Sequence, residues 1–101
     1  MTYIRVRWIH EFPNDPVILY SELDSERMET RKVEVYDDGH CGFASTTECG
    51  GDTILGELPI PALSEIAEDS QFEPEEILQV EFEKIWEQRH GKVENGSGRT
   101  L

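Results

Sequence analysis

The sequence predicts an α+β domain, in which an antiparallel four- to five-stranded sheet is followed by two helices packed on one face of that sheet. Three observations lead to this prediction. Apolar and polar residues alternate with a period of two through the first half, as in strands that are buried on one side. Asp37-Asp38-Gly39 has the composition of a hairpin turn. Apolar residues near the C-terminal end recur every three or four positions, which indicates helices.

Four segments of the first half have strand character. They are residues 3–9, 17–23, 28–36 and 40–45. In the first segment Ile4, Val6 and Trp8 are directed to one side, and in the third Val33 and Val35 point to the core. The third and fourth segments form a hairpin, because the glycine of the turn accepts a positive φ without steric cost.

The second half begins with a glycine-rich loop and continues into segments that prolines delimit. Residues 53–58 are a candidate edge strand, because the prolines that follow prevent regular pairing. Residues 61–69 predict a short amphipathic helix, since Pro61 suits a first turn and Leu63 and Ile66 lie on one side. An apolar stripe predicts the last helix, with acidic residues before it and basic residues at its end, as the helix dipole favours. The stripe is Leu78, Phe82, Ile85 and Trp86, with Arg89 at the next position of the same spacing, and the acidic residues are Glu73, Glu75 and Glu76.

We expect a single domain over residues 1–90, followed by a disordered tail over residues 91–101 of the 101-residue chain. The apolar positions of the predicted strands and helices should form the core. They are Ile4, Val6, Trp8, Leu19, Val33, Val35, Phe43, Leu63, Ile66, Phe82, Ile85 and Trp86.

The charge of the chain excludes several classes of function. The chain contains 9 Lys and Arg against 22 Asp and Glu, a formal net charge of −13. Sequence-independent nucleic-acid binding depends on basic residues, and an anionic membrane surface would repel this protein. No segment approaches the roughly 20 apolar residues that span a bilayer. The first residues alternate apolar and charged side chains, unlike a signal peptide, so we expect a cytoplasmic protein.

The residues that carry metal or nucleophilic chemistry are few. Cys41 and Cys49 are expected to be free thiols, and no His or Cys pair has the spacing of zinc ligands. His40 and Cys41 are adjacent on a predicted strand, so their side chains point to opposite faces. Acidic residues beside Cys49 disfavour a thiolate there. We therefore predict no catalytic residue, no metal and no cofactor.

The negative charge is concentrated in one part of the sequence. Residues 37–90 contain 2 basic and 14 acidic side chains, a balance of −12. Gathered on one side of the fold, such a surplus speeds encounter with a basic partner. The simpler interpretation is a solvated surface that provides solubility. The predicted partner-binding carboxylates lie in the turn, the glycine loop and the first helix, and are Asp37, Asp38, Glu48, Asp52, Glu65, Glu68 and Asp69.

Several motifs together resemble a known family over about residues 2–88. They are Tyr3-Ile4-Arg5-Val6-Arg7-Trp8 with His10, Leu19-Tyr20-Ser21-Glu22-Leu23-Asp24, Leu55-Gly56-Glu57, Glu65-Ile66-Ala67, and Glu81-Phe82-Glu83 with Ile85-Trp86. The chain resembles a family of small, acidic, uncharacterised bacterial domains that is carried as a domain of unknown function. In type, such domains resemble the immunity proteins encoded beside bacterial toxins, which is an analogy and assigns no chemistry.

The leading functional hypothesis is a non-enzymatic binding protein with a basic protein partner, most concretely an immunity protein that neutralises a nuclease-like toxin. The alternative is a small ligand-binding regulator or enzyme with a pocket between sheet and helices, using His10, Tyr20 or His40. A third hypothesis is self-association, which the high charge disfavours, so we expect a monomer or weak dimer.

Overall fold

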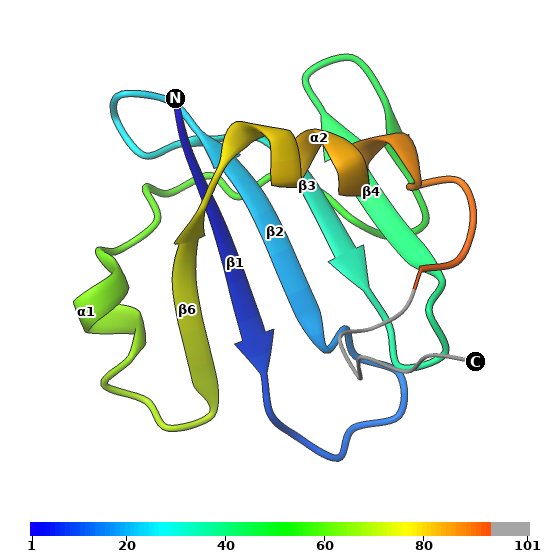
Figure 1. Cartoon of the computed structure of the whole chain (residues 1–101), viewed down its shortest axis with the longest axis horizontal. Helices are drawn as coiled ribbons and strands as arrows, with labels where there is room; N and C mark the ends of the chain where they lie inside the picture. The colour runs from blue at the N-terminus through cyan, green and yellow to red at the C-terminus, as the bar shows by residue number, and fades with distance from the viewer. Residues whose placement is uncertain (94–101) are drawn as a thin grey trace.

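The computed structural model describes residues 1–93 as an antiparallel sheet of six strands with two short helices (Figure 1). In chain order the elements are β1 (Thr2–Trp8), β2 (Ile18–Leu23), β3 (Glu29–Val35), β4 (Cys41–Ser45), β5 (Cys49–Gly50), α1 (Leu63–Ile66), β6 (Phe72–Ile77) and α2 (Gln79–Glu87). The strand order is β5-β4-β3-β2-β1-β6. The first five strands therefore follow one another across the sheet, and β6 returns to lie beside β1.

The α+β class is confirmed, but the sheet has more strands than predicted. The segment Phe72-Glu73-Pro74, between the two predicted helices, begins β6. Residues 53–58 form no strand, whereas Cys49 and Gly50 in the glycine loop pair with β4. The last helix begins at Gln79, so the acidic residues expected at its start belong to a strand.

Complementary side chains explain why β6 pairs with β1. Arg5 lies opposite Glu75 and Arg7 opposite Glu73 in the antiparallel register, and opposite charges on facing strands stabilise pairing. The Arg5 guanidinium lies 2.8 Å from the Glu75 carboxylate. Pro74 is compatible with this position because β6 is an edge strand, whose outer side needs no ladder donors.

The β3–β4 hairpin is confirmed at the predicted turn. Gly39 adopts φ +92°, a left-handed conformation that glycine tolerates best. The Gly39 amide donates to the Tyr36 carbonyl at 2.9 Å, and the Val93 amide donates to the Gly39 carbonyl at 2.8 Å. Lys92 and Val93, in the predicted tail, therefore contact the hairpin, and the remainder of the tail lies outside the described residues.

Two hydrophobic clusters form the core, one on each face of the sheet. The larger is covered by α2 and contains Tyr3, Ile18, Val33, Val35, Phe43, Ile77, Phe82 and Ile85. The smaller contains Ile4, Val6 and Leu23, against which Leu19, Ile60, Leu63, Ile66 and Phe72 pack. Neighbouring residues of β1 belong to different clusters, so α1 and α2 lie against opposite faces. The prediction that both helices pack on one face is therefore wrong.

Trp8 lies at the border of the smaller cluster rather than inside the core. Its side chain is half-buried, and its ring stacks on Phe72 with centroids 5.9 Å apart. Its indole N–H donates to the side chain of Gln71 at 3.1 Å. Trp8 therefore fixes the beginning of β6 against the end of β1.

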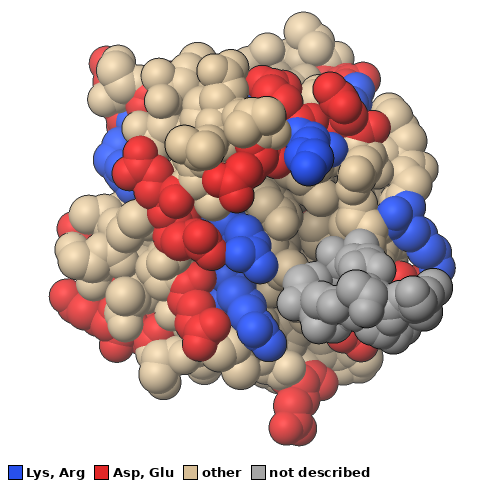
Figure 2. All heavy atoms as spheres, in the orientation of Figure 1, with Lys and Arg blue, Asp and Glu red and all other residues tan. Residues whose placement is uncertain are grey.

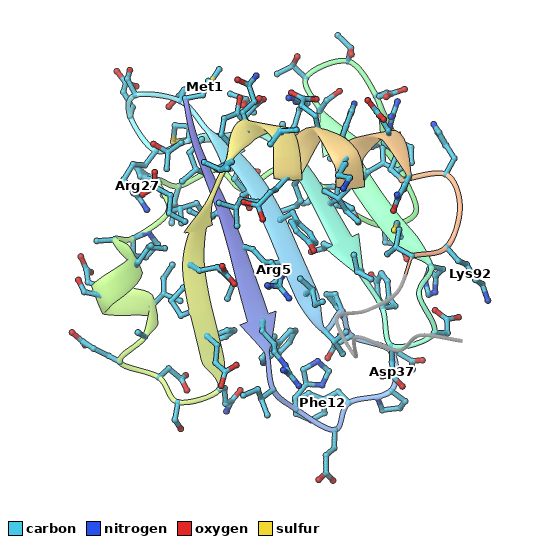
Figure 3. All side chains as sticks on the ribbon, viewed as in Figure 1. Met1, Arg5, Phe12, Arg27, Asp37 and Lys92 are labelled. Atoms are coloured by element: carbon cyan, nitrogen blue, oxygen red, sulfur yellow. The ribbon has the colours of Figure 1, made fainter. Side chains whose placement is uncertain are left out.

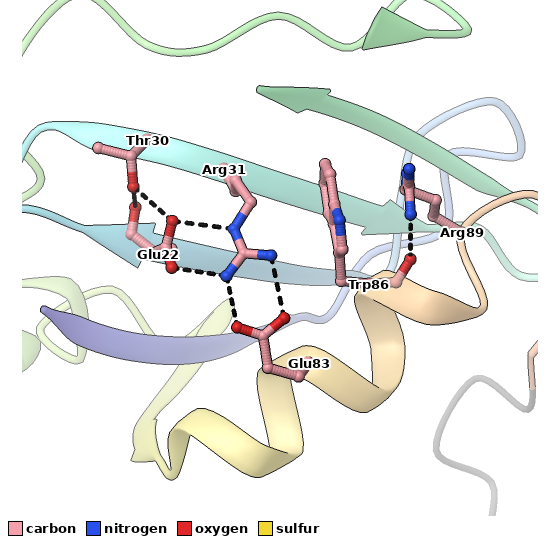
Figure 4. A network of polar contacts seen from close by, with 6 residues as sticks. All are labelled: Glu22, Thr30, Arg31, Glu83, Trp86 and Arg89. Carbon is pink, nitrogen blue, oxygen red and sulfur yellow. Dashed lines mark hydrogen bonds and ion pairs between the residues drawn. The ribbon is translucent and has the colours of Figure 1, made fainter. Parts of the chain in front are cut away.

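A network of ion pairs fastens α2 to the sheet (Figure 4). The Arg31 guanidinium on β3 donates to Glu22 on β2 and, through two nitrogens, to Glu83 on α2. Arg31 and Thr30 hydrogen bonds hold the pKa of Glu22 at about 2. The Trp86 ring lies between two guanidinium groups, with Arg31 at 5.1 Å and Arg89 at 4.1 Å from its centroid. These contacts position the helix that covers the larger cluster.

Candidate binding surface

The seven predicted partner-binding carboxylates do not form one patch. Asp37 and Asp38 lie in the β3–β4 turn, and Glu48 and Asp52 flank β5. The remaining three are Glu65, Glu68 and Asp69, in and just after α1. α1 contacts β6, and β5 and β6 are opposite edges of the sheet. Six strands about 4.8 Å apart separate the edges by about 24 Å, so a single partner surface would have to cross the sheet to contact both groups.

The carboxylates on the β5 side include two that pair with neighbouring side chains. The Arg89 guanidinium donates to Glu48 at 2.6 Å. Asp38 accepts hydrogen bonds from the backbone and the ring of His40, and these bonds lower the pKa of Asp38. These contacts fix the turn and the end of α2, and they reduce the charge that this side offers to a partner.

The other side of the molecule has a denser set of carboxylates, which we call the acidic edge. All six members are exposed and lie on α1, on β6 or between them. They are Glu65, Glu68, Asp69, Glu73, Glu75 and Glu76. Within residues 1–93, Glu75 is the one member in an ion pair, with Arg5. Figure 2 shows Asp and Glu side chains gathered over the side that carries α1 and β6, beside Lys and Arg side chains over β1.

The sequence explains why the acidic edge remains uncompensated. Between Lys32 and Lys84 there is no Lys or Arg and there are 14 Asp and Glu. On β1 the Arg5 guanidinium already pairs with Glu75, and beside α1 the Arg27 guanidinium donates to the backbone carbonyls of Ile60 and Pro61. Figure 3 places Arg5 over the sheet, at a distance from the α1 side chains. The field of the acidic edge is therefore left to act on a partner.

The outer side of β6 does not favour addition of another strand. Pro74 lacks a backbone N–H, and Glu73, Glu75 and Glu76 place three negative charges on a strand of six residues. Proline and repeated charge on an edge strand oppose pairing with a second sheet. A partner would contact this edge through side chains and not through backbone pairing.

A groove of about 450 Å³ lies beside the acidic edge, between α1 and the sheet face of the smaller cluster. Its apolar lining is Ile4, Val6, Leu19, Ile60, Pro61, Ile66 and Phe72. Glu65 and Asp69 also line it. Glu65 and Asp69 therefore connect the acidic edge to the groove, whereas Glu73 and Glu75, which pair opposite Arg7 and Arg5, are directed to the other face of the sheet.

The polar side chains of the groove are satisfied within the protein. The side chain of Glu29 is only 3% exposed. Its carboxylate accepts from the Ser21 hydroxyl at 2.9 Å and the Gly56 amide at 2.7 Å, and it pairs with the Lys32 ammonium at 3.1 Å. This buried pair is neutral as a unit, and it also fixes the loop that walls the groove. Apolar walls and the two rim carboxylates remain as recognition groups.

The residues predicted for a small-molecule pocket are not brought together. His10 pairs with the Pro16 carbonyl at 2.8 Å and packs against Trp8. Tyr20 lies on the face that α2 covers, and His40 stacks on Tyr36 in the β3–β4 hairpin with centroids 4.3 Å apart. None of the three predicted residues lines the groove.

Cysteine and metal chemistry has little support in the described part of the chain. Cys41 is half-buried, which raises the pKa of its thiol, and Cys49 is exposed; both are free thiols. Within residues 1–93, no three His, Cys, Asp or Glu side chains are arranged to hold a metal ion. Among the same residues, no helix has the length and apolar character needed to cross a membrane.

Comparison with known proteins places the chain in a family. The sequence model of a domain of unknown function, DUF6881, matches residues 2–91. The chain belongs to this family. The DUF6881 match runs from β1 through α2, so both the acidic edge and the groove lie inside the family domain. No curated protein and no solved structure matches the chain.

Proposed function

We propose that the chain is a non-enzymatic binding protein whose acidic edge docks a positively charged surface of another protein. Its most concrete form is an immunity protein that neutralises a basic, nuclease-like toxin. The observation that supports this proposal is the acidic edge itself. Six exposed carboxylates lie on adjoining elements, and within residues 1–93 one of them is in an ion pair.

The acidic edge has the physical properties that such docking requires. Like-signed charges on one side of a molecule accelerate encounter with an oppositely charged partner and suppress partners of the same sign. The backbone of β6 is held by its pairing with β1, so its carboxylates are carried on a rigid element. A nuclease binds phosphates through Lys and Arg, and a row of fixed carboxylates would compete with phosphates for such a cleft.

The groove supports a second candidate, the binding of a small molecule. Its volume of about 450 Å³ is in the range of small-ligand sites. However, the buried Glu29 carboxylate in the groove already has three partners inside the protein. A polar ligand would have to displace one of these partners, so we favour a protein partner.

Affinity capture with matched charge variants tests the proposal. The edge variant Glu68→Lys/Glu73→Lys/Glu76→Lys reverses three exposed carboxylates of the acidic edge, none of them in an ion pair within residues 1–93. The control variant Glu11→Lys/Glu26→Lys/Glu87→Lys makes the same change in net charge at exposed positions elsewhere. We expect wild type and control to retain the same basic protein from a lysate of the source organism, and the edge variant to lose it. Capture of that protein by the edge variant, or of no basic protein by wild type, would contradict the proposal.

A further inference from the structure

The groove has a wall that is held in place before any partner binds. Ile60 and Pro61 line the groove at the end of the loop of residues 54–61, and Arg27 fixes them by donating to both of their carbonyls at 2.7 Å. The Ile60 amide donates in turn to the Arg27 carbonyl at 2.8 Å. Arg27 makes these contacts at φ +64°, a left-handed conformation uncommon outside glycine. A wall fixed in this way lowers the entropy cost of binding.

Exposed apolar side chains continue from the groove along the same loop. Ile54 and Leu58 are 70% and 76% exposed. The Lys32 ammonium, which lines the groove, reaches the Ile54 carbonyl at 3.2 Å. Exposed apolar groups gathered around a hollow and bordered by charge are typical of protein interaction sites.

The charges at the rim determine the chemistry of the occupant. Glu65 and Asp69 line the groove and belong to the acidic edge, whereas the Lys32 charge is paired with Glu29. Within residues 1–93 neither of these two carboxylates is in an ion pair, although Asp69 accepts a hydrogen bond from the Gln71 amide at 2.9 Å. They would repel an anionic apolar group and attract a cationic one. The favoured occupant therefore combines an apolar body with adjacent positive charge.

We propose that the groove receives one large apolar side chain of the basic partner, flanked in the partner's sequence by Lys or Arg residues that meet Glu65 and Asp69. This inference rests on the proposed function and adds an anchor site to it. Interfaces commonly concentrate binding energy in one apolar anchor that fills a pocket, surrounded by charged residues that set orientation. The acidic edge would then steer the partner, and the groove would hold it.

Three synthetic heptapeptides with glycine ends test the anchor. The first has a central Phe with two Lys on each side, the second replaces Phe by Ser, and the third keeps Phe but replaces every Lys by Glu. Dissociation constants are measured by calorimetry at low salt with the full chain. We expect the first peptide to bind at least about tenfold more tightly than the second, because Phe loses contact with water in the groove. We expect no binding of the third.

Two variants that fill the groove without changing charge complete the test. Ile66→Trp and Leu19→Trp each place a larger side chain in the lining, from α1 and from the sheet respectively. A thermal melt identifies a variant that fails to fold, and the other then carries the test. We expect each of these substitutions to weaken binding of the Phe peptide until it equals that of the Ser peptide. The dissociation constant of the Ser peptide should stay unchanged.

The outcomes separate this inference from the proposed function. Equal binding of the two Lys peptides, or an advantage of Phe that survives in a folded filled variant, overturns the anchor and leaves the acidic edge in place. Binding of the Glu peptide as tight as that of the first overturns the charge requirement. Failure of all three peptides to bind overturns the anchor, while the capture experiment decides separately on the acidic edge.

Discussion

Arg31 on β3 and Glu83 on α2 are joined by two parallel hydrogen bonds, 3.0 and 2.6 Å long. The same guanidinium also donates to Glu22, whose side chain is only 9% exposed. A residue of the sheet thus carries the contact that positions the helix above the larger cluster. Arg31 is consequently a polar anchor of α2, beside the buried Phe82 and Ile85 that pack into the larger cluster.

Arg31→Ala should destabilise the fold strongly. The substitution leaves Glu22 buried without its cation, and it removes the guanidinium that lies over the rings of Phe82 and Trp86. We expect the free energy of unfolding to fall by about 3 kcal/mol, measured by urea denaturation. Lys84→Ala, on an exposed lysine of α2 that makes no ion pair within residues 1–93, is the matched control and should change it by less than about 0.5 kcal/mol. Similar losses in both variants would show that the network does not hold α2.

Stability should fall in acid through the same network. The pKa of Glu22 is lowered to about 2 from an ordinary value of 4.5, so the unfolded chain binds a proton there before the folded one does. The contribution of Glu22 is complete above about pH 5 and is lost as the pH falls toward its folded pKa. Glu83, whose pKa Arg31 also lowers, adds to the effect in the same direction.

The difference in the free energy of unfolding between wild type and Glu22→Gln isolates the titration of Glu22 from that of the other carboxylates. We expect the free energy of unfolding of wild type to exceed that of Glu22→Gln at pH 7, and the gap to narrow between about pH 4.5 and pH 2. Denaturant melts at a series of pH values measure the gap. A gap that stays constant over this interval would contradict the assignment.

Gly39 should tolerate no side chain, in contrast to Gly91. A Cβ at Gly39 would collide with the Val93 carbonyl, and the left-handed φ adds strain. A Cβ at Gly91 would meet nothing closer than the Gln88 carbonyl, 3.9 Å away. We expect Gly39→Ala to cost about 1 kcal/mol or more and Gly91→Ala to be nearly neutral. Melting temperatures that fall equally in Gly39→Ala and Gly91→Ala would contradict this prediction.

The charged edge strand should keep the chain from associating with itself. The variant Glu73→Thr/Pro74→Thr/Glu76→Thr removes the proline ring and two adjacent charges from β6. It supplies a backbone N–H donor and side chains that favour strands. We expect sedimentation velocity to show concentration-dependent association of this variant and a monomer for wild type. A variant that remains monomeric at all concentrations would mean that other features protect the edge.

The sequence predicts the strands from Thr2 to Ser45 well because apolar and polar residues alternate through β1 and β3, β2 is an apolar run, and a glycine turn fixes one hairpin. It fails at β6, because Glu73, Glu75 and Glu76 resemble the acidic first turn of a helix. The available signal was the match between Arg5 and Arg7 in β1 and glutamates spaced two apart, which indicates facing strands. Such a long-range match is hard to distinguish from chance in a chain with 22 acidic residues.

The candidate site was predicted only in part, for the same reason. Glu65, Glu68 and Asp69 were expected in a binding surface, and they do lie in the acidic edge. Their neighbours from β6 could not be added while that segment was taken for a helix start. The count of charges along the sequence also does not reveal that the sheet separates Asp37 and Glu48 from the acidic edge. The distance between these two sets of carboxylates depends on the strand order.

The salt dependence of binding to the isolated basic partner tests the central claim most directly. The dissociation constant is measured between about 0.05 and 0.5 M NaCl, a range in which exposed charges become screened, for wild type, the edge variant and the control variant. The proposal predicts that salt weakens binding of wild type and control by similar factors, and that the edge variant binds far more weakly at low salt. Binding that is insensitive to salt, or equal for the two variants, would contradict it.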